Sequence, residues 1–475
     1  MLDAGASAWW WLLLLQLASG AALSCLDESG AAVDWWFLIK HPRWADKSHK
    51  DCIGNCDGDT YVYITSASPS SWSIGGAPVT SATGSLLGQT LAGIYSGAVP
   101  NYVFYNDQLP DGSWSEKYGH SKGFFGFDGS DGAFWVQHSI PKFPDYVKSG
   151  YEFGSGQLWY GQHAFCMSLS AKSLDAIAEV MTYAYVQVYD HALKDTSLSN
   201  VNAVVAGTQA SGTKSVQVEA PWGTLRLFGK ASAADEDMLD AIASPALATS
   251  LLGQSWLNSG GPIGGYCPVS GVDVKDILTL TLPADDSHVT YVDHSKWAVA
   301  QPAGSGWWCA LDNNHVASQE TRSGLAVCLE QPHTAALLRA AAAKVGPCGP
   351  DPGPAPPGPG PAGACCYQDD DKCTNGQTCC SDSGKSYASE TTCKQYGAAH
   401  GCEWEAADDR CVVGSGPPPP PTPGGACCYY NDESCEHGET CCSSSGKSYE
   451  SEATCKRYGE KHGCAWESGS CVVEG

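Results

Sequence analysis

The chain has 475 residues, 24 of them cysteine, and a formal net charge of −25 at pH 7. That length is enough for one large or two ordinary domains, and the acidity argues against binding a polyanion through a broadly basic surface. So many cysteines indicate an oxidising compartment, because disulfides persist there and not in the cytosol.

The first 22 residues predict a secretory signal peptide. They contain the apolar run WWWLLLLQLA, too short to span a membrane, followed by the small residues SGAA. Cleavage is expected after Ala22, although no Lys or Arg precedes the run. No later segment approaches about 18 apolar residues, which argues against an integral membrane protein. The chain lacks an N-x-[ST] sequon, so glycan-dependent delivery to lysosomes is not expected; secretion or a vacuole-like or lysosomal acidic compartment stays open.

Residues 23–348 have the mixed pattern of an α/β or α+β domain. Short runs rich in aromatic and β-branched residues predict strands, and apolar residues at helical spacing predict helices. The expected strands lie at 60–65, 102–106, 132–140 and 278–283, and the expected helices at 174–186, 235–252 and 333–345.

Residues 121–140 predict a hairpin, with strands on both sides of a Gly129–Gly132 turn. If the numbers of paired residues add up to an even number, His138 lies across from Lys122 and near His120 on one face of the hairpin. A slip of one residue in the register separates them. His138 is therefore a candidate for binding substrate, although packing beneath the sheet explains it equally well.

The tripeptide His-Ser-Lys occurs twice, at 120–122 and 294–296. The first copy also fits the G-x-S-x-G pattern of serine hydrolases, which would make Ser121 a nucleophile. That motif needs a strand before the serine and a helix after it. Here a polar, turn-rich stretch precedes Ser121, and a strand, a turn and a second strand follow it. The sequence therefore disfavours a serine hydrolase.

The last 111 residues hold 16 cysteines in two tandem repeats. Residues 364–413 and 426–475 share the pattern CC-x6-C-x5-CC-x12-C-x8-C, each followed by one more cysteine. Modules of this size lack the apolar area to fold alone, so disulfides are expected, with zinc as the competing interpretation. The Pro- and Gly-rich stretches 349–363 and 414–425 predict extended linkers.

Six blocks stand out within residues 24–348: SCLDESGAAVDWWFLIKHP at 24–42, FYNDQ at 104–108, GHSKG at 119–123, FWVQHSIPKFP at 134–144, YGQ at 160–162 and DHSKW at 293–297. Together, and in this order, they resemble the deoxyribonuclease II family. The resemblance implies an endonuclease with a phospholipase-D-like fold, in which two similar halves related by a pseudo-twofold each supply one His-x-Lys.

Carried over by motif, the resemblance implies one site at the seam between the halves, with the catalytic residues His120, Lys122, His294 and Lys296. Cleavage of a phosphodiester needs a nucleophile, a proton donor and positive charge around the phosphoryl oxygens. One imidazole attacks phosphorus to form a phosphohistidine, and the other protonates the departing 5′-oxygen and later activates water. The lysines do what Mg²⁺ does elsewhere, so no metal or other cofactor is expected. His120 is the favoured nucleophile.

The expected substrate is DNA, bound locally at the basic seam. Histidines that titrate as a coupled pair around pH 6.5 suit an acidic compartment. The alternatives are a phosphodiesterase that acts on RNA or another phosphodiester, and a secreted binding protein with a vestigial nuclease fold. Recurring aromatic residues in the repeats predict either binding of a carbohydrate or cell surface or a small disulfide-bound core; they are Tyr367, Tyr429, Trp404 and Trp466.

The resemblance also implies two disulfides near the end of the catalytic domain, Cys267–Cys348 and Cys309–Cys328. The partner of Cys25 is less clear, because the cysteine that usually precedes the YGQ block is replaced by Leu158 here. Three candidates stay open, namely Cys52, Cys56 and Cys166.

Overall fold

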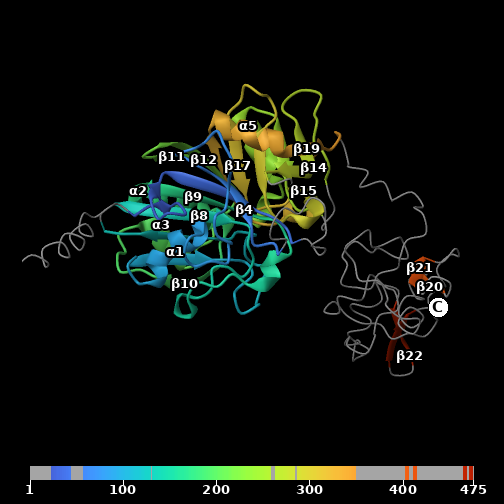
Figure 1. The fold of residues 1–475 in the computed structure, drawn as a ribbon, viewed down its shortest axis with the longest axis horizontal. Helices are drawn as coiled ribbons and strands as arrows, with labels where there is room; N and C mark the ends of the chain where they lie inside the picture. Colours follow the sequence, from blue (N-terminus) through green and yellow to red (C-terminus); the bar gives the residue numbers. More distant parts are fainter. Residues whose placement is uncertain are drawn as a thin grey trace, which may run out of the picture. The chain divides into compact units, whose positions relative to one another are not determined.

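The computed structural model divides the chain into two units, with the boundary after Pro352 (Figure 1). None of the helices that the structure describes is long and apolar enough to cross a membrane. The described residues are 23–43, 57–129, 131–257, 263–283, 286–348 and four short segments of the second unit, 402–405, 410–413, 464–467 and 470–473.

The first half of the large unit is built on an eight-stranded sheet in which all neighbours are antiparallel. Three helices accompany it: α1 (Leu86–Tyr95), α2 (Ala171–Ala184) and α3 (Ser199–Val205). The strand order is β10 (Val188–Ala192), β6 (Asn101–Tyr105), β7 (Gly123–Phe127), β8 (Gly132–His138), β9 (Gln162–Ser170), β3 (Trp35–Lys40), β4 (Tyr61–Thr65) and β5 (Ser73–Ile74).

The second half is built on a nine-stranded sheet, in which β13 and β14 are parallel neighbours. Helix α5 (Pro332–Ala341) follows its strand β18, and Figure 1 shows this helix at the top of the unit. The strand order is β11 (Thr213–Ala220), β12 (Gly223–Lys230), β18 (Gly324–Glu330), β17 (Trp307–Leu311), β16 (Trp297–Ala300), β13 (Leu251–Gln254), β14 (Val274–Leu282) and β15 (Asp286–Val289), with β19 (Ala342–Val345) also paired to β14.

The two sheets repeat one topology. The order β6-β7-β8-β9-β3 in the first sheet corresponds to β13-β16-β17-β18-β12 in the second, and a helix follows β9 and β18 alike. Each His-x-Lys comes directly before an equivalent strand, β7 in one half and β16 in the other. The expected fold of two similar halves is therefore confirmed.

The strands of the first sheet alternate buried side chains between two hydrophobic clusters, as period-two geometry requires. Trp135 on β8 belongs to a large cluster that contains residues of both sheets, whereas its neighbour Phe134 belongs to a second cluster with α1. Across the sheets, the rings of Phe37 and Trp308 have centroids 5.0 Å apart. This shared aromatic core fixes the two halves against each other and thereby aligns the loops at their strand ends.

The sequence predicted the strands better than the helices. The hairpin register is the even one, since Gly123 pairs with Gln137. The helix expected at 235–252 is wrong in its second part: a π-helix (η4, Met238–Ala243) and the short α4 (Ser244–Leu247) end at Ala248, whose φ is 50°, and β13 then starts. The helix expected at 333–345 ends at Ala341, because the following residues pair with β14.

Three disulfides lie in the described part of the large unit. Two of them are the pairs that the resemblance implies, Cys267–Cys348 and Cys309–Cys328. Cys25 is bonded to Cys166, which ties β1 (Cys25–Leu26) to β9. The other cysteine candidates for Cys25 lie outside the described residues.

Most of each cysteine-rich repeat, and both linkers, also lie outside the described residues. Each repeat contributes one antiparallel hairpin, β20 (Cys402–Glu405) with β21 (Arg410–Val413) and β22 (Cys464–Glu467) with β23 (Ser470–Val473). Trp404 pairs with Cys411, and Trp466 with Cys471, so the two hairpins have the same register.

Candidate active site

Each His-x-Lys is held by a loop of the opposite half. The backbone N–H of His120 donates to the carbonyl of Ser323 at 2.9 Å, and that of His294 donates to the carbonyl of Gly161 at 2.8 Å. Ser323 directly precedes β18 and Gly161 directly precedes β9, so the two contacts are equivalent. Each motif is therefore hydrogen-bonded to the other half through its histidine backbone.

Asp107 holds the first motif. Its carboxylate lies 2.5 Å from Nζ of Lys122, accepts a hydrogen bond from Nη2 of Arg322 at 2.6 Å, and lies 3.9 Å from Nε2 of His120. Asp107 follows β6 and Arg322 comes from the second half, so this ion cluster crosses the seam. Nδ1 of His120 is buried and has no hydrogen-bond partner in the described part of the chain.

Two aromatic rings enclose His294 in the second motif. Its ring stacks on Tyr160 with centroids 4.0 Å apart, and the ring of Trp256 lies 4.3 Å away on a tilted plane. Lys296 folds back so that Nζ donates to the carbonyl of His294 at 2.7 Å. Nε2 of His294 is buried without a hydrogen-bond partner among the described residues, so this ring keeps one nitrogen available.

A chain of buried hydrogen bonds joins the two motifs. The hydroxyl of Ser121 donates to Asp312, whose other oxygen accepts from Nε2 of Gln137 at 2.8 Å. The Gln137 oxygen lies 3.3 Å from Nε2 of His163, and Nδ1 of His163 accepts the backbone N–H of Lys296 at 3.0 Å. Because Nδ1 accepts, Nε2 carries the ring proton and donates to Gln137.

Burial and the two lysines set the protonation of the site. Burial lowers the pKa of His120 and of His294 well below the usual value, and the charges of Lys122 and Lys296 lower both further. Burial, together with Lys122, lowers the pKa of Lys296 to about 7. Since Lys296 acts on His120 and Lys122 acts on His294, the charges of each motif reach the ring of the other.

His138 lies on the opposite face of β8 from Gln137. Its backbone N–H donates to the carbonyl of Lys122 at 3.1 Å, as the even register requires. Its ring packs against Phe124 and Phe143, with centroids 6.0 and 5.6 Å away, and Nδ1 accepts from the N–H of Ile140. Contact between His138 and substrate stays a prediction.

The surroundings of Ser121 do not form a nucleophile elbow. The segment before it contains no strand, β7 rather than a helix follows it, and its hydroxyl is bonded to Asp312. Burial raises the pKa of Asp312 to about 6, although the donated hydrogen bonds oppose that rise.

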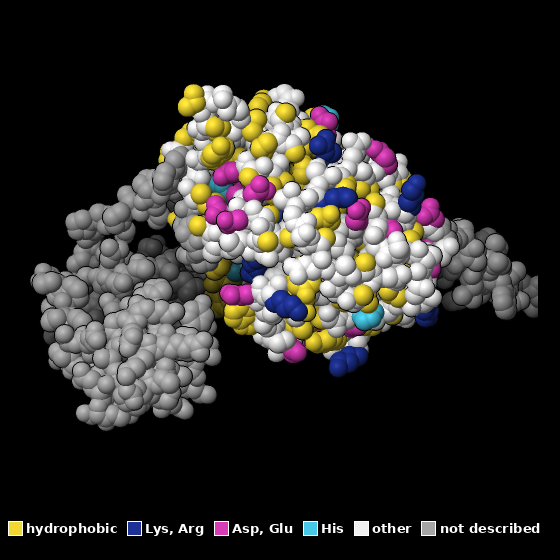
Figure 2. All heavy atoms as spheres, turned by 180° about the vertical axis from the view of Figure 1, so that it is seen from behind, with side chains coloured by type: hydrophobic (Ala, Val, Ile, Leu, Met, Phe, Trp, Pro, Cys, Tyr) yellow, Lys and Arg dark blue, Asp and Glu magenta, His cyan; other side chains and the backbone are white. Residues whose placement is uncertain are grey.

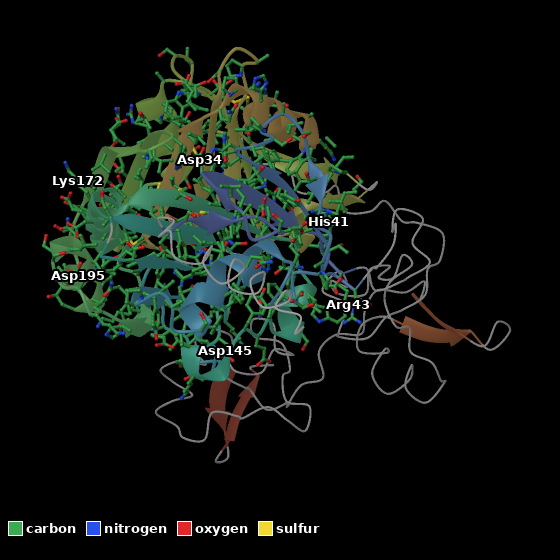
Figure 3. The ribbon with its side chains drawn as sticks, turned by 60° about the vertical axis from the view of Figure 1, so that its left-hand side comes forward. Asp34, His41, Arg43, Asp145, Lys172 and Asp195 are labelled. Carbon is green, nitrogen blue, oxygen red and sulfur yellow. A yellow bond between two sulfur atoms is a disulfide. The ribbon has the colours of Figure 1, made fainter. Side chains whose placement is uncertain are left out.

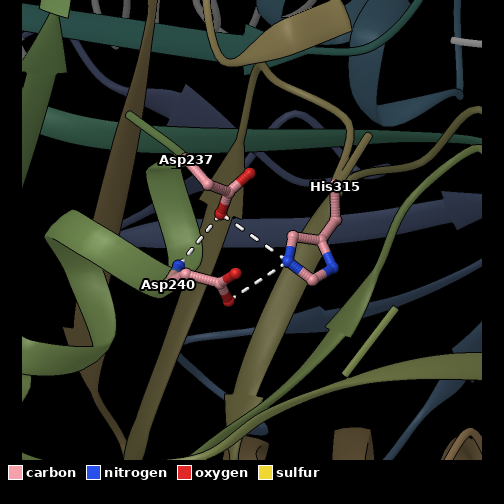
Figure 4. Close-up of side chains that lie close together, drawn as sticks. All are labelled: Asp237, Asp240 and His315. Atoms are coloured by element: carbon pink, nitrogen blue, oxygen red, sulfur yellow. Dashed lines mark hydrogen bonds and ion pairs between the residues drawn. The ribbon is translucent and has the colours of Figure 1, made fainter. Parts of the chain in front are cut away.

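Asp237, Asp240 and His315 form the one group of carboxylate and imidazole ligands, in the described part of the chain, that could hold a metal ion (Figure 4). Nε2 of His315 lies 3.1 Å from Asp240 and 3.7 Å from Asp237, and Nδ1 lies 2.7 Å from Asp276. Burial lowers the pKa of His315, but these carboxylates outweigh it and raise that pKa well above its usual value. The group is satisfied as a buried ion-pair network, and no His-x-Lys residue belongs to it.

On the face that Figure 2 draws, Lys and Arg side chains of the described residues are scattered among acidic ones and form no broad basic patch. A hollow of about 370 Å³ is lined by residues that include Lys172 and Asp195, none of them from either motif. Figure 3 places these two on the other side of the unit from His41 and Arg43, which follow β3. The lysines of the two motifs, Lys122 and Lys296, are instead buried.

Sequence reasoning missed the residues that hold the motifs. Asp107 stands in the FYNDQ block, which was noticed only as part of the resemblance, and nothing in the spacing pairs it with Lys122. Asp312 and His163 have no local signal, because their partners are far away in the chain.

Comparison with known proteins supplies the family. The family model for deoxyribonuclease II matches residues 24–348. Deoxyribonuclease-2-alpha of Mus musculus is 31% identical over 330 residues, covering 66% of this chain and 89% of that protein. Deoxyribonuclease-2-alpha of Bos taurus is 32% identical, covering 65% and 86%, and plancitoxin-1 of Acanthaster planci is 28% identical, covering 70% and 95%. Among solved structures, yeast tyrosyl-DNA phosphodiesterase matches 46% of this chain and 68% of that chain, with a TM-score of 0.24 and 9% identity.

Proposed function

Since the chain belongs to the deoxyribonuclease II family, it is a phosphodiester-hydrolysing endonuclease that acts on DNA, and we propose that it cleaves through a phosphohistidine without a metal ion. The observation that supports this proposal is the reciprocal docking of the two motifs, which brings two histidines and two lysines to one buried seam. The predicted family resemblance is confirmed.

In the proposed reaction His120 attacks phosphorus and His294 protonates the 5′-oxygen as it departs. The P–O5′ bond breaks as the N–P bond forms, so the first product carries a 5′-hydroxyl. His294 then removes a proton from water, which attacks the phosphohistidine and releases a 3′-phosphate. Each ring has a buried nitrogen with no hydrogen-bond partner among the described residues, as an attacking or donating atom requires.

The lysines support a reaction that needs no metal ion. Lys122 and Lys296 are buried beside the histidines, where a fixed positive charge stabilises phosphoryl oxygens more strongly than in water. Both side chains are held in place before substrate binds, because the Lys296 ammonium donates to the carbonyl of His294 and the Lys122 ammonium pairs with the carboxylate of Asp107.

The first test is cleavage of plasmid DNA at about pH 5 in EDTA, because acid favours the protonated donor imidazole, whose pKa burial and the nearby lysines lower. Nicked and linear products with 5′-hydroxyl and 3′-phosphate ends are expected. A requirement for added Mg²⁺ would remove the proposed mechanism, and 5′-phosphate ends would reverse the leaving group. The same assay with RNA decides the alternative substrate.

We propose the secretory pathway as the location of the chain, ending in secretion or an acidic lysosome-like compartment. The three described disulfides support this, because they are stable only under oxidising conditions. The cysteine-rich repeats are proposed as accessory modules; binding of carbohydrate or a cell surface by them stays a prediction.

A further inference from the structure

Two lysines outside the His-x-Lys motifs are fully buried at equivalent places. Lys40 is the last residue of β3 and Lys230 the last residue of β12, and each has 0% of its surface exposed. The strands β3 and β12 occupy the same position in the two sheets, next to β9 and β18. A buried ammonium is costly unless hydrogen bonds satisfy it, so the partners of these two groups are informative.

Lys40 binds the loop that holds His294. Its Nζ donates to the carbonyls of His41 and Gly58, both at 2.8 Å, and to that of Leu158 at 3.2 Å. Leu158 ends a short 3-10 helix, η2 (Ser155–Leu158). Tyr160, two residues after Leu158, stacks on His294. Gly161, three residues after Leu158, accepts the His294 N–H with its carbonyl.

Lys230 binds the loop that holds His120 in the same way. Its Nζ donates to the carbonyl of Gln319 at 2.8 Å and to that of Glu320 at 2.6 Å. Gln319 ends a short 3-10 helix, η6 (Ala317–Gln319). Three residues after Glu320 comes Ser323, whose carbonyl accepts the His120 N–H.

The correspondence includes the crossing between halves. In each case the Nζ of a buried lysine donates a hydrogen bond to a carbonyl at the end of a short helix. The carbonyl three residues further along the chain accepts the backbone N–H of the histidine of the other half. We propose that Lys40 and Lys230 are paired positioning residues, Lys40 for His294 and Lys230 for His120. This inference rests on the proposed function, because it assigns a separate catalytic step to each lysine through the histidine that its loop holds.

The charges agree with this geometry. Beyond burial, the positive charges that lower the pKa of His294 are those of Lys296, Lys122 and, more weakly, Lys40. Burial lowers the pKa of Lys230 to about 8, so its ammonium is fully protonated under acidic conditions and keeps its donors.

The test compares substrates with different leaving groups under single-turnover conditions. In a thymidine dinucleotide the 5′-oxygen needs a proton to depart, whereas in the p-nitrophenyl ester of thymidine 3′-phosphate the leaving group departs without one. Loss of the general acid therefore slows the dinucleotide far more than the ester, and loss of the nucleophile slows both equally. The variants are Lys40→Met and Lys230→Met, with His294→Ala and His120→Ala as references.

We expect Lys40→Met to cleave the dinucleotide about 10²-fold more slowly than the unaltered protein but the ester less than about threefold more slowly. The reference variant His294→Ala should likewise be slowed more on the dinucleotide than on the ester. Lys230→Met should lose about the same factor on both, like His120→Ala. Lys214→Met is the matched control, since that lysine is partly exposed on β11 and pairs with Glu179; it should leave both rates unchanged. Equal losses for both lysine variants on both substrates would show a structural role only and overturn the inference.

A second measurement does not depend on the proposed chemistry. Imidazole ¹⁵N spectra should show the His294 signals shifted in Lys40→Met with those of His120 in place, and the reverse in Lys230→Met. Shifts of both rings, or of neither, would overturn the inference even if cleavage follows another mechanism. If a methionine variant does not fold, the arginine variant is measured in its place, because it keeps the charge and displaces the donors.

Discussion

Lys296 donates its backbone N–H to Nδ1 of His163 at 3.0 Å, although the two residues belong to different halves of the unit. This bond fixes the tautomer of His163, whose Nε2 then donates to Gln137, and Gln137 in turn donates to Asp312 beside the first motif. Lys296, which is proposed to be catalytic, is therefore held by a side chain of the other half.

Replacing His163 with leucine should lower kcat by about 10²-fold with little change in KM, because misplacing Lys296 by about 1 Å costs that much in a positioned site. Steady-state cleavage of a fluorescent oligonucleotide measures both constants. His191→Leu, at an exposed position on β10, is the matched control. An unchanged kcat in His163→Leu would mean that the N–H of Lys296 needs no acceptor there.

The cleavage rate should decrease on the alkaline side of its pH profile with a midpoint below about pH 6.5, the ordinary histidine pKa. The donor imidazole must be protonated, and burial with the nearby lysines holds the pKa of both histidines well below that value. The nucleophile must be neutral, so the profile is bell-shaped and its limbs belong to the coupled pair. An alkaline limb above pH 7 would contradict the lowered pKa values of the two histidines.

Removing the Lys296 charge should move that limb. In Lys296→Met the pKa values of both histidines rise, because the ammonium that opposes their protonation is gone. We expect kcat/KM to drop by at least about tenfold while its alkaline limb moves to higher pH. A drop without a shift would show that Lys296 acts on phosphate alone.

The two cross-links that bury their cysteines should differ in their effect on stability. Cys25–Cys166 closes a loop of 141 residues and Cys309–Cys328 one of 19. The chain-entropy model gives about 5 kcal/mol for the first and about 3 kcal/mol for the second. Urea unfolding of Cys25→Ala/Cys166→Ala and of Cys309→Ala/Cys328→Ala compares them, and a larger loss for the shorter loop would count against this ranking.

The hairpin that contains His138 shows what the sequence predicts well. Its turn residues and strand-forming runs predict both strands, and of the two registers that the sequence leaves open, the structure has the even one. The helix expected at 235–252 failed for a non-local reason. Leu251 and Leu252 follow a helical pattern, yet they pair with β16 and β14, and tertiary pairing outweighs local propensity.

The same reasoning explains which site residues were found. The two His-x-Lys motifs are contiguous, so the resemblance identified them. Lys40 stands in the block at 24–42 and Lys230 in none of the quoted blocks, and their equivalence exists only in the strand order of the folded sheets. That equivalence could not be predicted, because no periodicity links positions in different halves.

A chain that ends at Ala364 should cleave plasmid DNA at close to the full-length rate. The residues proposed for catalysis and positioning all precede the first cysteine-rich repeat, and the family model ends at residue 348. The Pro- and Gly-rich stretch after Cys348 separates the repeats from the catalytic unit in sequence. Initial rates on plasmid in EDTA, normalised to folded protein by near-ultraviolet circular dichroism, compare the two chains. Loss of cleavage with an intact fold would make the repeats part of the catalytic unit.

Equal rates on plasmid, with weaker retention of the shortened chain on insoluble polysaccharide, would assign the repeats to anchoring, since two linked modules gain avidity for a repeating polymer.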